Sequence, residues 1–153
     1  MTMIKNQTLK MYVIVGLLFI IVSCNPESKP IIYGEDKCEF CRMSIVDQRF
    51  GGEIVTKKGK AYKFDAVECL VNYMDERIED ESKLKFILTN TYDHPGELIN
   101  ASECAYLKSE NMPSPMGMFL NPFKELTEAT KLQNENTGTI FNWKELRKDF
   151  AKN

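Results

Sequence analysis

The apolar positions of the chain predict a pair of strands, a helix and a third strand between residues 53 and 90. Residues 53–56 and 61–64 are rich in strand-forming side chains and flank a Lys-Lys-Gly turn, which indicates a β-hairpin. Residues 65–78 follow, with Asp65 as a candidate N-cap, and their apolar side chains recur at helical spacing. These side chains are Val67, Leu70, Val71 and Met74. Residues 83–90 alternate again and close the unit as a strand.

The same order of elements is expected a second time further along the chain. Residues 104–109 and 116–121 have the pattern of strands and are separated by a proline-rich segment. A helix is expected over residues 121–132, whose first two residues are an asparagine suited to the N-cap and a proline suited to the first helical position. Residues 138–143 have the pattern of a closing strand, and a short terminal helix is expected to follow.

The two stretches resemble one another closely enough to suggest an internal duplication. A shift of 56 residues carries Tyr62 onto Met118 and Asp65 onto Asn121. Each unit would leave one face of its sheet uncovered, so we expect the two units to pack against each other. The predicted fold class is α+β, with two similar ββαβ units: residues 36–92 form the first, and residues 93–153 hold a connector, the second unit and the terminal helix.

The amino-terminal segment predicts export and lipid attachment. Two lysines precede an apolar run at residues 11–22, which is the length of a secretory signal and short for a membrane span. The run ends in Ile-Val-Ser-Cys, which resembles a bacterial lipobox, so we expect cleavage after residues 1–23 and a lipid on Cys24. Residues 24–35 would be a linker, and the domain would be tethered to a membrane of the cell envelope, facing the periplasm or the exterior. The alternative is an uncleaved signal anchor.

Composition narrows the possible functions. The chain carries 20 Lys and Arg against 22 Asp and Glu, a net charge of −2, and the basic residues are interspersed with acidic ones. No basic face with interleaved aromatic residues is apparent, which argues against nucleic-acid binding. The single histidine, His94, has no nucleophile motif around it, and no phosphate-binding glycine loop is present. We therefore expect a monomeric binding protein and not an enzyme.

Residues 38–43 read Cys-Glu-Phe-Cys-Arg-Met and combine thiols with a thioether. These are soft ligands, and soft ligands favour Cu(I). In an extended segment Cys41 and Met43 would project to the same side, because side chains alternate along a strand. A third sulfur is available from residues 110–119, which contain Met112, Met116 and Met118. Among these, Met116 lies in a loop between a proline and a glycine, whereas Met118 has the pattern of a core residue.

Other uses of the cysteines remain open at this point. Cys38 and Cys41 could serve a thiol-disulfide oxidoreductase, although nothing but linker precedes them and a β-branched stretch follows. A structural zinc site could use these two with Cys69 and Cys104, although the second pair lacks knuckle spacing. The simplest expectation for Cys69 and Cys104 is that they are small, semi-buried residues, or otherwise a reduced or paired thiol.

Together, the lipobox, the Cys-x-Met segment and the later Pro-Met-Gly resemble the NosL family of copper-binding lipoproteins, which are accessory to nitrous oxide reductase. The resemblance runs from about Asp36 to Leu146. The family's Cys-Gly-Met corresponds to Cys41-Arg42-Met43, and its Pro-Met-Gly to Pro115-Met116-Gly117. It implies two ββαβ units, one bound Cu(I) with Cys41, Met43 and Met116 as ligands, and transfer of copper to assembly proteins or to apo nitrous oxide reductase.

Three departures from the family pattern bear on the site. Arg42 stands where the family has glycine. Many relatives have a histidine soon after the Cys-Gly-Met, whereas this chain offers only His94, in the connector between the units. Cys38 is an additional thiol, and it is either a second sulfur ligand or the partner of Cys41 in a disulfide.

Overall fold

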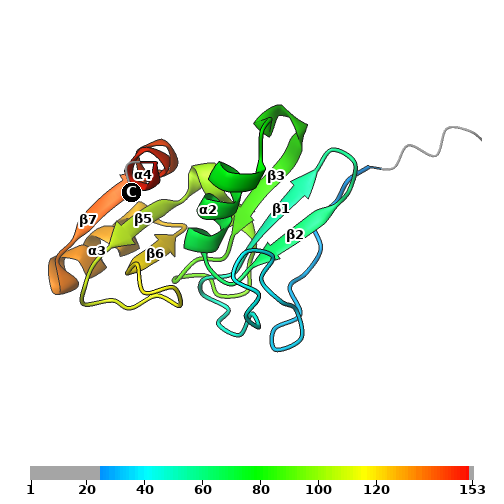
Figure 1. The fold of residues 1–153 in the computed structure, drawn as a ribbon. Coiled ribbons are helices and arrows are strands. Elements are labelled where there is room, and N and C mark those ends of the chain that lie inside the picture. The colour runs from blue at the N-terminus through cyan, green and yellow to red at the C-terminus, as the bar shows by residue number, and fades with distance from the viewer. Residues whose placement is uncertain (1–24, 152–153) are drawn as a thin grey trace, which may run out of the picture.

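The computed structural model describes residues 25–151 (Figure 1). The predicted signal peptide and the candidate lipidation site Cys24 lie outside the described residues. Within residues 25–151, no helix is long and apolar enough to cross a membrane.

The first sheet is antiparallel and has four strands in the order β2-β1-β3-β4. Its strands are β1 (Gly52–Thr56), β2 (Ala61–Phe64), β3 (Leu84–Thr89) and β4 (Ile99–Asn100). The predicted hairpin and the third strand are confirmed. Gly59, with φ of +80°, supplies the left-handed residue that the hairpin turn between β1 and β2 requires. The short β4 comes from the connector and extends the first sheet beside β3.

The second sheet is also antiparallel and has three strands in the order β6-β5-β7. Its strands are β5 (Ala105–Lys108), β6 (Leu120–Phe123) and β7 (Thr139–Asn142). In both sheets the first strand of the unit is central and is flanked by the second and the third. The expectation of an α+β fold with two similar ββαβ units is therefore confirmed.

The helices lie at different places in the two units. Helix α2 (Val67–Arg77) lies between the sheets and contacts β1 and β2 on one side and β6 on the other (Figure 1). Helix α3 (Leu126–Asn136) packs on the second sheet. The predicted terminal helix is α4 (Trp143–Phe150), which contacts α2 and begins with a capping box between Asn142 and Glu145. Helix α2 is thus the element that the two units share.

The hydrophobic core follows from this arrangement. The larger cluster joins α2 to both sheets and to α4. It includes Phe64, Leu70, Met74, Tyr106, Leu120 and Leu146. The smaller cluster lies under α3 and includes Leu107, Met112, Phe123 and Ala129. Met74 is therefore a core residue, as the sequence pattern predicts.

The predicted start of the second helix is wrong. Asn121 and Pro122 belong to β6, and α3 begins only at Leu126. Pro122 lacks the N–H that a central strand needs, but β6 is the edge of its sheet, where proline is tolerated. Asn121 is buried, and its Nδ2 donates to the Met112 carbonyl at 3.0 Å.

The N-cap predicted for the first helix is also wrong. The number of residues that separates the two helices differs from the expected shift as well. The N-cap of α2 is Ala66, which makes no side-chain capping bond, so Asp65 does not have that role. Helix α3 starts at Leu126 and α2 at Val67, so the two helices are 59 positions apart, in place of the expected 56.

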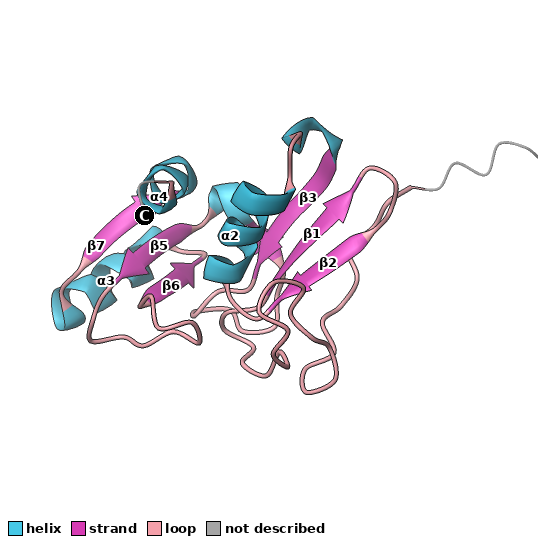
Figure 2. Cartoon of the chain, viewed as in Figure 1, coloured by secondary structure: helices cyan, strands magenta, loops and turns pink. Residues whose placement is uncertain are grey.

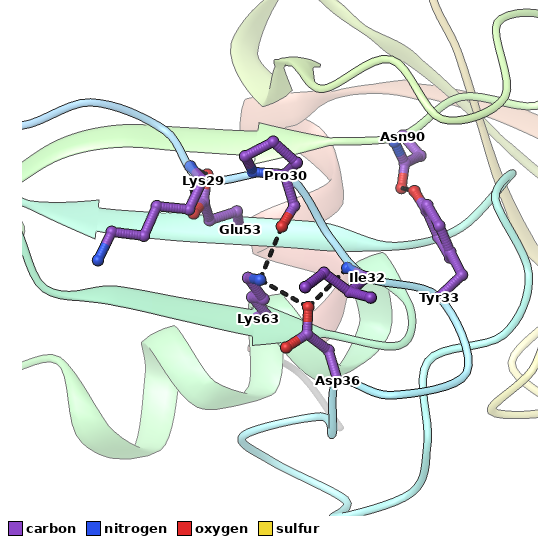
Figure 3. Close-up of polar contacts among 8 residues, drawn as sticks. All are labelled: Lys29, Pro30, Ile32, Tyr33, Asp36, Glu53, Lys63 and Asn90. Atoms are coloured by element: carbon purple, nitrogen blue, oxygen red, sulfur yellow. Dashed lines mark hydrogen bonds and ion pairs between the residues drawn. The ribbon is translucent and has the colours of Figure 1, made fainter.

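An amino-terminal strap, defined here as residues 29–36, is fastened to the first sheet (Figure 3). The carboxylate of the buried Glu53 on β1 accepts two bonds from the Lys29 backbone N–H, at 2.9 and 3.1 Å. The Nζ of Lys63 on β2 donates to the Pro30 carbonyl at 2.7 Å and to Asp36 Oδ2 at 2.6 Å. This strap leads directly into the cysteine segment.

Candidate metal centre

The cysteine segment lies in a long stretch, residues 31–50, that contains no helix or strand (Figure 2). It folds back on itself as a tight loop closed by an isolated antiparallel bridge between Lys37 and Ser44. Inside the loop the Cys38 N–H donates to the Met43 carbonyl at 2.8 Å, and the Arg42 N–H donates to the Cys38 carbonyl at 3.0 Å. We call residues 37–44 the cysteine loop.

The expectation that Cys41 and Met43 lie in an extended segment is wrong. Residues 39–41 form a turn, and Arg42 has φ of 68°, in the left-handed region. The alternation of a strand therefore does not apply across Arg42. The two side chains differ in exposure, since Cys41 is half-buried whereas Met43 is 52% exposed.

Backbone hydrogen bonds from two neighbouring segments hold the cysteine loop in place. The Glu39 N–H donates to the Lys63 carbonyl on β2 at 2.8 Å. On the other side the Ile45 N–H donates to the Asp36 carbonyl of the strap at 2.9 Å. The loop is therefore attached both to the first sheet and to the strap that precedes it.

Three cysteines meet at the base of this loop. The Sγ atoms of Cys38, Cys41 and Cys69 all lie within 4.8 Å of one another, and all three thiols are free. Cys69 comes from the first turn of α2, and both it and Cys38 are fully buried. We call these three residues the thiol cluster. Cys41 is its most exposed member.

The spacing of the thiol cluster suits a soft metal ion. Three sulfurs that surround one ion in a plane, each about 2.3 Å from it, lie about 4 Å apart. A set of three thiolates selects soft or borderline ions such as Cu(I) and Zn(II) over cations that prefer oxygen. The cluster can therefore take up one ion with only small movements of its side chains.

The pKa values of the three thiols are shifted in different directions. A hydrogen bond from the Cys69 thiol lowers the pKa of Cys38 to about 5, against the effect of burial and with the help of backbone N–H groups. The pKa of Cys69 is raised far above its ordinary value because its thiol is bonded to Cys38 and is buried. Burial also raises the pKa of Cys41. The bond between the two buried thiols therefore favours the thiolate form at Cys38 and the protonated form at Cys69.

The methionines proposed as ligands lie in different surroundings. Met116 is partly buried and packs against the core cluster that contains Cys38 and Cys69. Met43 is exposed at the surface of the cysteine loop. Met118 packs partly buried against the same core cluster as Met116, whereas Met112 is buried in the smaller cluster under α3. Met112 is thus buried in a cluster that contains none of the three thiols.

Two other candidate ligands lie apart from the thiol cluster. Cys104 is buried next to β5, and its thiol donates to the Asn100 carbonyl at 3.5 Å. Among residues 25–151 the group of possible metal ligands that includes Cys38, Cys41 and Cys69 does not include Cys104, so a zinc site made of four cysteines is ruled out. His94 lies in the connector, with its Nδ1 at 3.5 Å from Asp93 Oδ1, and it is likewise outside the group.

Cys69 is the member of the cluster that reasoning from sequence did not include among the candidate copper ligands. It was expected to be a small, semi-buried residue, because its neighbours form the apolar face of a helix. One signal was available: Cys69 follows within five residues of the end of β2, the strand that holds the cysteine loop. A thiol in the first turn of that helix therefore lies near the end of β2, where the cysteine loop is attached.

Comparison with known proteins agrees with this architecture. The NosL family model matches residues 31–151. Among solved structures, the copper chaperone NosL from Shewanella denitrificans superimposes with a TM-score of 0.67 at 19% identity, covering 78% of this chain and 94% of that one. No curated protein matches the chain. The family match spans both ββαβ units, the cysteine loop and Cys69, and it follows that the chain belongs to the NosL family.

Proposed function

We propose that this protein is a lipid-anchored Cu(I) chaperone that delivers copper for the maturation of a copper centre of nitrous oxide reductase. The observation that carries the proposal is the thiol cluster, in which three sulfurs from two separate segments lie within 4.8 Å of one another. Membership of the NosL family supports a role in copper handling. The fold shared with a copper chaperone is consistent with that role.

The ligands have distinct roles in this proposal. Cys38 and Cys69 are fully buried and hold the ion on its inner side. Cys41 is half-buried and forms the outer ligand, where an approaching sulfur or imidazole of a partner can reach the ion. Met43, exposed on the cysteine loop, and Met116, packed against the core, offer thioethers that can take the place of a thiol in this soft, two- or three-coordinate set.

Delivery follows as ligand exchange and involves no catalysed reaction. Cu(I) is stable with two or three ligands, so a partner's donor can add on the exposed side before Cys41 leaves. The recipient would be a copper-receiving assembly protein or apo nitrous oxide reductase. A lipid on Cys24 would keep the exchange at the membrane of the cell envelope.

The geometry is less favourable for thiol-disulfide exchange. Such a site needs an accessible nucleophilic thiolate, because attack on a disulfide sulfur requires access. Here the thiol with the lowered pKa is Cys38, which has no exposed surface, while Cys41 is the accessible one. A buried thiolate can serve as a ligand of a bound copper ion, whereas its burial hinders attack on the disulfide of another molecule.

The proposal is tested by an anaerobic titration of the reduced full-length protein with Cu(I) against a chromophoric competitor. We expect one Cu(I) ion per chain. Cys41→Ser or Cys69→Ser should lower the Cu(I) affinity roughly 100-fold, because loss of a direct ligand should cost at least as much as loss of an outer-shell partner. Cys104→Ser is the matched control, since Cys104 is a buried cysteine outside the cluster. Cu(I) binding that is indifferent to Cys69, or a preference for Zn(II), would contradict the proposed site.

Delivery is tested separately by mixing the copper-loaded protein with apo nitrous oxide reductase and following the copper in each protein after separation. We expect net transfer that depends on Cys41. If copper stays on the chaperone while a small-molecule thiol removes it readily, the recipient is a different protein and the copper site itself stands.

A further inference from the structure

Helix α2 carries a buried carboxyl group at the position directly before Cys69 of the thiol cluster. Residues 67–71 are all buried, because α2 lies between the first sheet and the second unit. Glu68 is among them and has no exposed surface. A carboxyl group in such a place is costly unless it is hydrogen-bonded, so its partner in the second unit is informative.

That partner is Ser114, in the loop between β5 and β6. The Ser114 Oγ–H donates to Glu68 Oε1, and the same Oγ accepts the Leu120 N–H at 3.3 Å. The Ser114 carbonyl also accepts the Gly117 N–H at 3.0 Å, which closes a turn around Met116. We call residues 112–119 the methionine loop. Its attachment to α2 is thus a side-chain bond between the two units.

The same bond joins two short segments that each contain a sulfur residue. Cys69 directly follows Glu68, and Met116 lies two positions after Ser114. Two residues span at most about 7 Å of chain, so the tether limits how far the Met116 backbone can move from α2. Met116 is already partly buried against the core cluster that contains Cys38 and Cys69.

We propose that Glu68 is a positioning residue of the metal centre: through Ser114 it holds the methionine loop so that the Met116 thioether lies against the thiol cluster. This rests on the proposed function and adds a residue that is not itself a ligand. A neutral thioether is a weak donor, and its contribution depends on its being held in place before the ion arrives. Outer-shell partners of metal ligands act in this way.

A double-mutant cycle in the full-length protein tests this role, with the Cu(I) affinity measured by competition. We expect Ser114→Ala and Met116→Ala each to lower the affinity roughly tenfold, and the double variant to lower it no further. Glu68→Gln retains an oxygen that accepts the Ser114 bond and should keep most of the affinity, whereas Glu68→Ala should not. X-ray absorption of the Cu(I)-loaded Ser114→Ala variant should show one sulfur fewer around the ion.

Ser109→Ala is the matched control. Ser109 is a buried serine just before the methionine loop, and its Oγ donates to the Asn136 carbonyl in α3 at 2.8 Å, away from α2. We expect it to change thermal stability and leave the Cu(I) affinity unaltered. Additive losses from Ser114→Ala and Met116→Ala, or an affinity indifferent to both, would overturn the positioning role alone. Failure of the unaltered protein to bind Cu(I) would overturn the proposed function as well.

Discussion

Arg42 shows how a single residue conflicts with the backbone that it occupies. Its φ of 68° is in the left-handed region, which costs an L-residue about 1–2 kcal/mol relative to the right-handed one. The side chain gains little in return, because it is 71% exposed and, among residues 25–151, pairs only with Glu39, at 3.5 Å. The geometry of the cysteine loop therefore favours glycine at this position, and Arg42 is strained there.

Arg42→Gly should raise the free energy of unfolding by roughly 0.5–1 kcal/mol, since relief of strain outweighs the added freedom of the unfolded chain. Urea denaturation measures the change. Lys58→Gly is the control, because Lys58 is exposed and its φ is negative, so glycine there should destabilise. A loss of stability in Arg42→Gly equal to that of the control would show that the left-handed backbone carries no strain.

At the scale of elements, helix α3 begins with help from a distant segment. Its N-cap Glu125 makes no side-chain capping bond. Instead, Asp93 in the connector accepts the N–H groups of Lys124 and Glu125, both at 2.9 Å. Burial alone would raise the pKa of Asp93, but these backbone bonds outweigh it and hold that pKa below its ordinary value. The start of α3 thus depends on a carboxylate some thirty residues upstream.

The Asp93 contribution should depend on pH. The folded-state pKa lies below the unfolded one, so the stabilisation is fully present above about pH 4 and is lost as the pH falls through the folded-state pKa. Asp93→Asn should cost about 1 kcal/mol near neutral pH and progressively less in acid. Urea unfolding of both proteins across this range checks the trend, with Glu110→Gln, at an exposed loop position, as the control. A constant difference at all pH values would refute the assignment.

For the molecule as a whole, Lys63 connects the strap, the cysteine loop and the first sheet. Its Nζ donates to the Pro30 carbonyl and to Asp36 (Figure 3). Its backbone carbonyl accepts the Glu39 N–H of the cysteine loop. The Asp36 and Lys63 side chains are 26% and 17% exposed, so water replaces these bonds only in part. One lysine therefore holds both the entry to the domain and the loop that carries two of the three thiols.

Lys63→Met should lower the free energy of unfolding by about 1–3 kcal/mol, because it leaves the part-buried Asp36 carboxylate without its donor and removes the bond to the Pro30 carbonyl. It should also speed amide hydrogen exchange in residues 29–45 more than in the second unit, as the strap opens locally. The exposed Lys57, changed to Met, serves as the control. Unchanged exchange in the strap would mean that other bonds hold it without Lys63. These are the bonds of Glu53 to the Lys29 N–H and the bond that the Tyr33 hydroxyl donates to Asn90 Oδ1 at 2.8 Å.

Most of the elements that were predicted correctly are determined by interactions between residues close in sequence. The hairpin around Gly59, β3, β5, β7 and α4 follow from periodicity and turn chemistry within a few residues. The prediction failed at Asn121 and Pro122, whose residue types suit a helix start equally well. Only the position of β6 at a sheet edge decides in favour of a strand there.

The sequence by itself determined the fold class, the two-unit organisation, the resemblance to the NosL family and the soft character of the candidate ligands, because each depends on residue type and short-range order. The tertiary structure alone decided which sulfurs meet. Cys69 lies 28 positions beyond Cys41, and its place in the thiol cluster depends on how α2 packs beneath the cysteine loop. The burial of Glu68 and its bond to Ser114 likewise exist only once the two units enclose α2. Contacts between distant segments are set by packing, which no local pattern encodes.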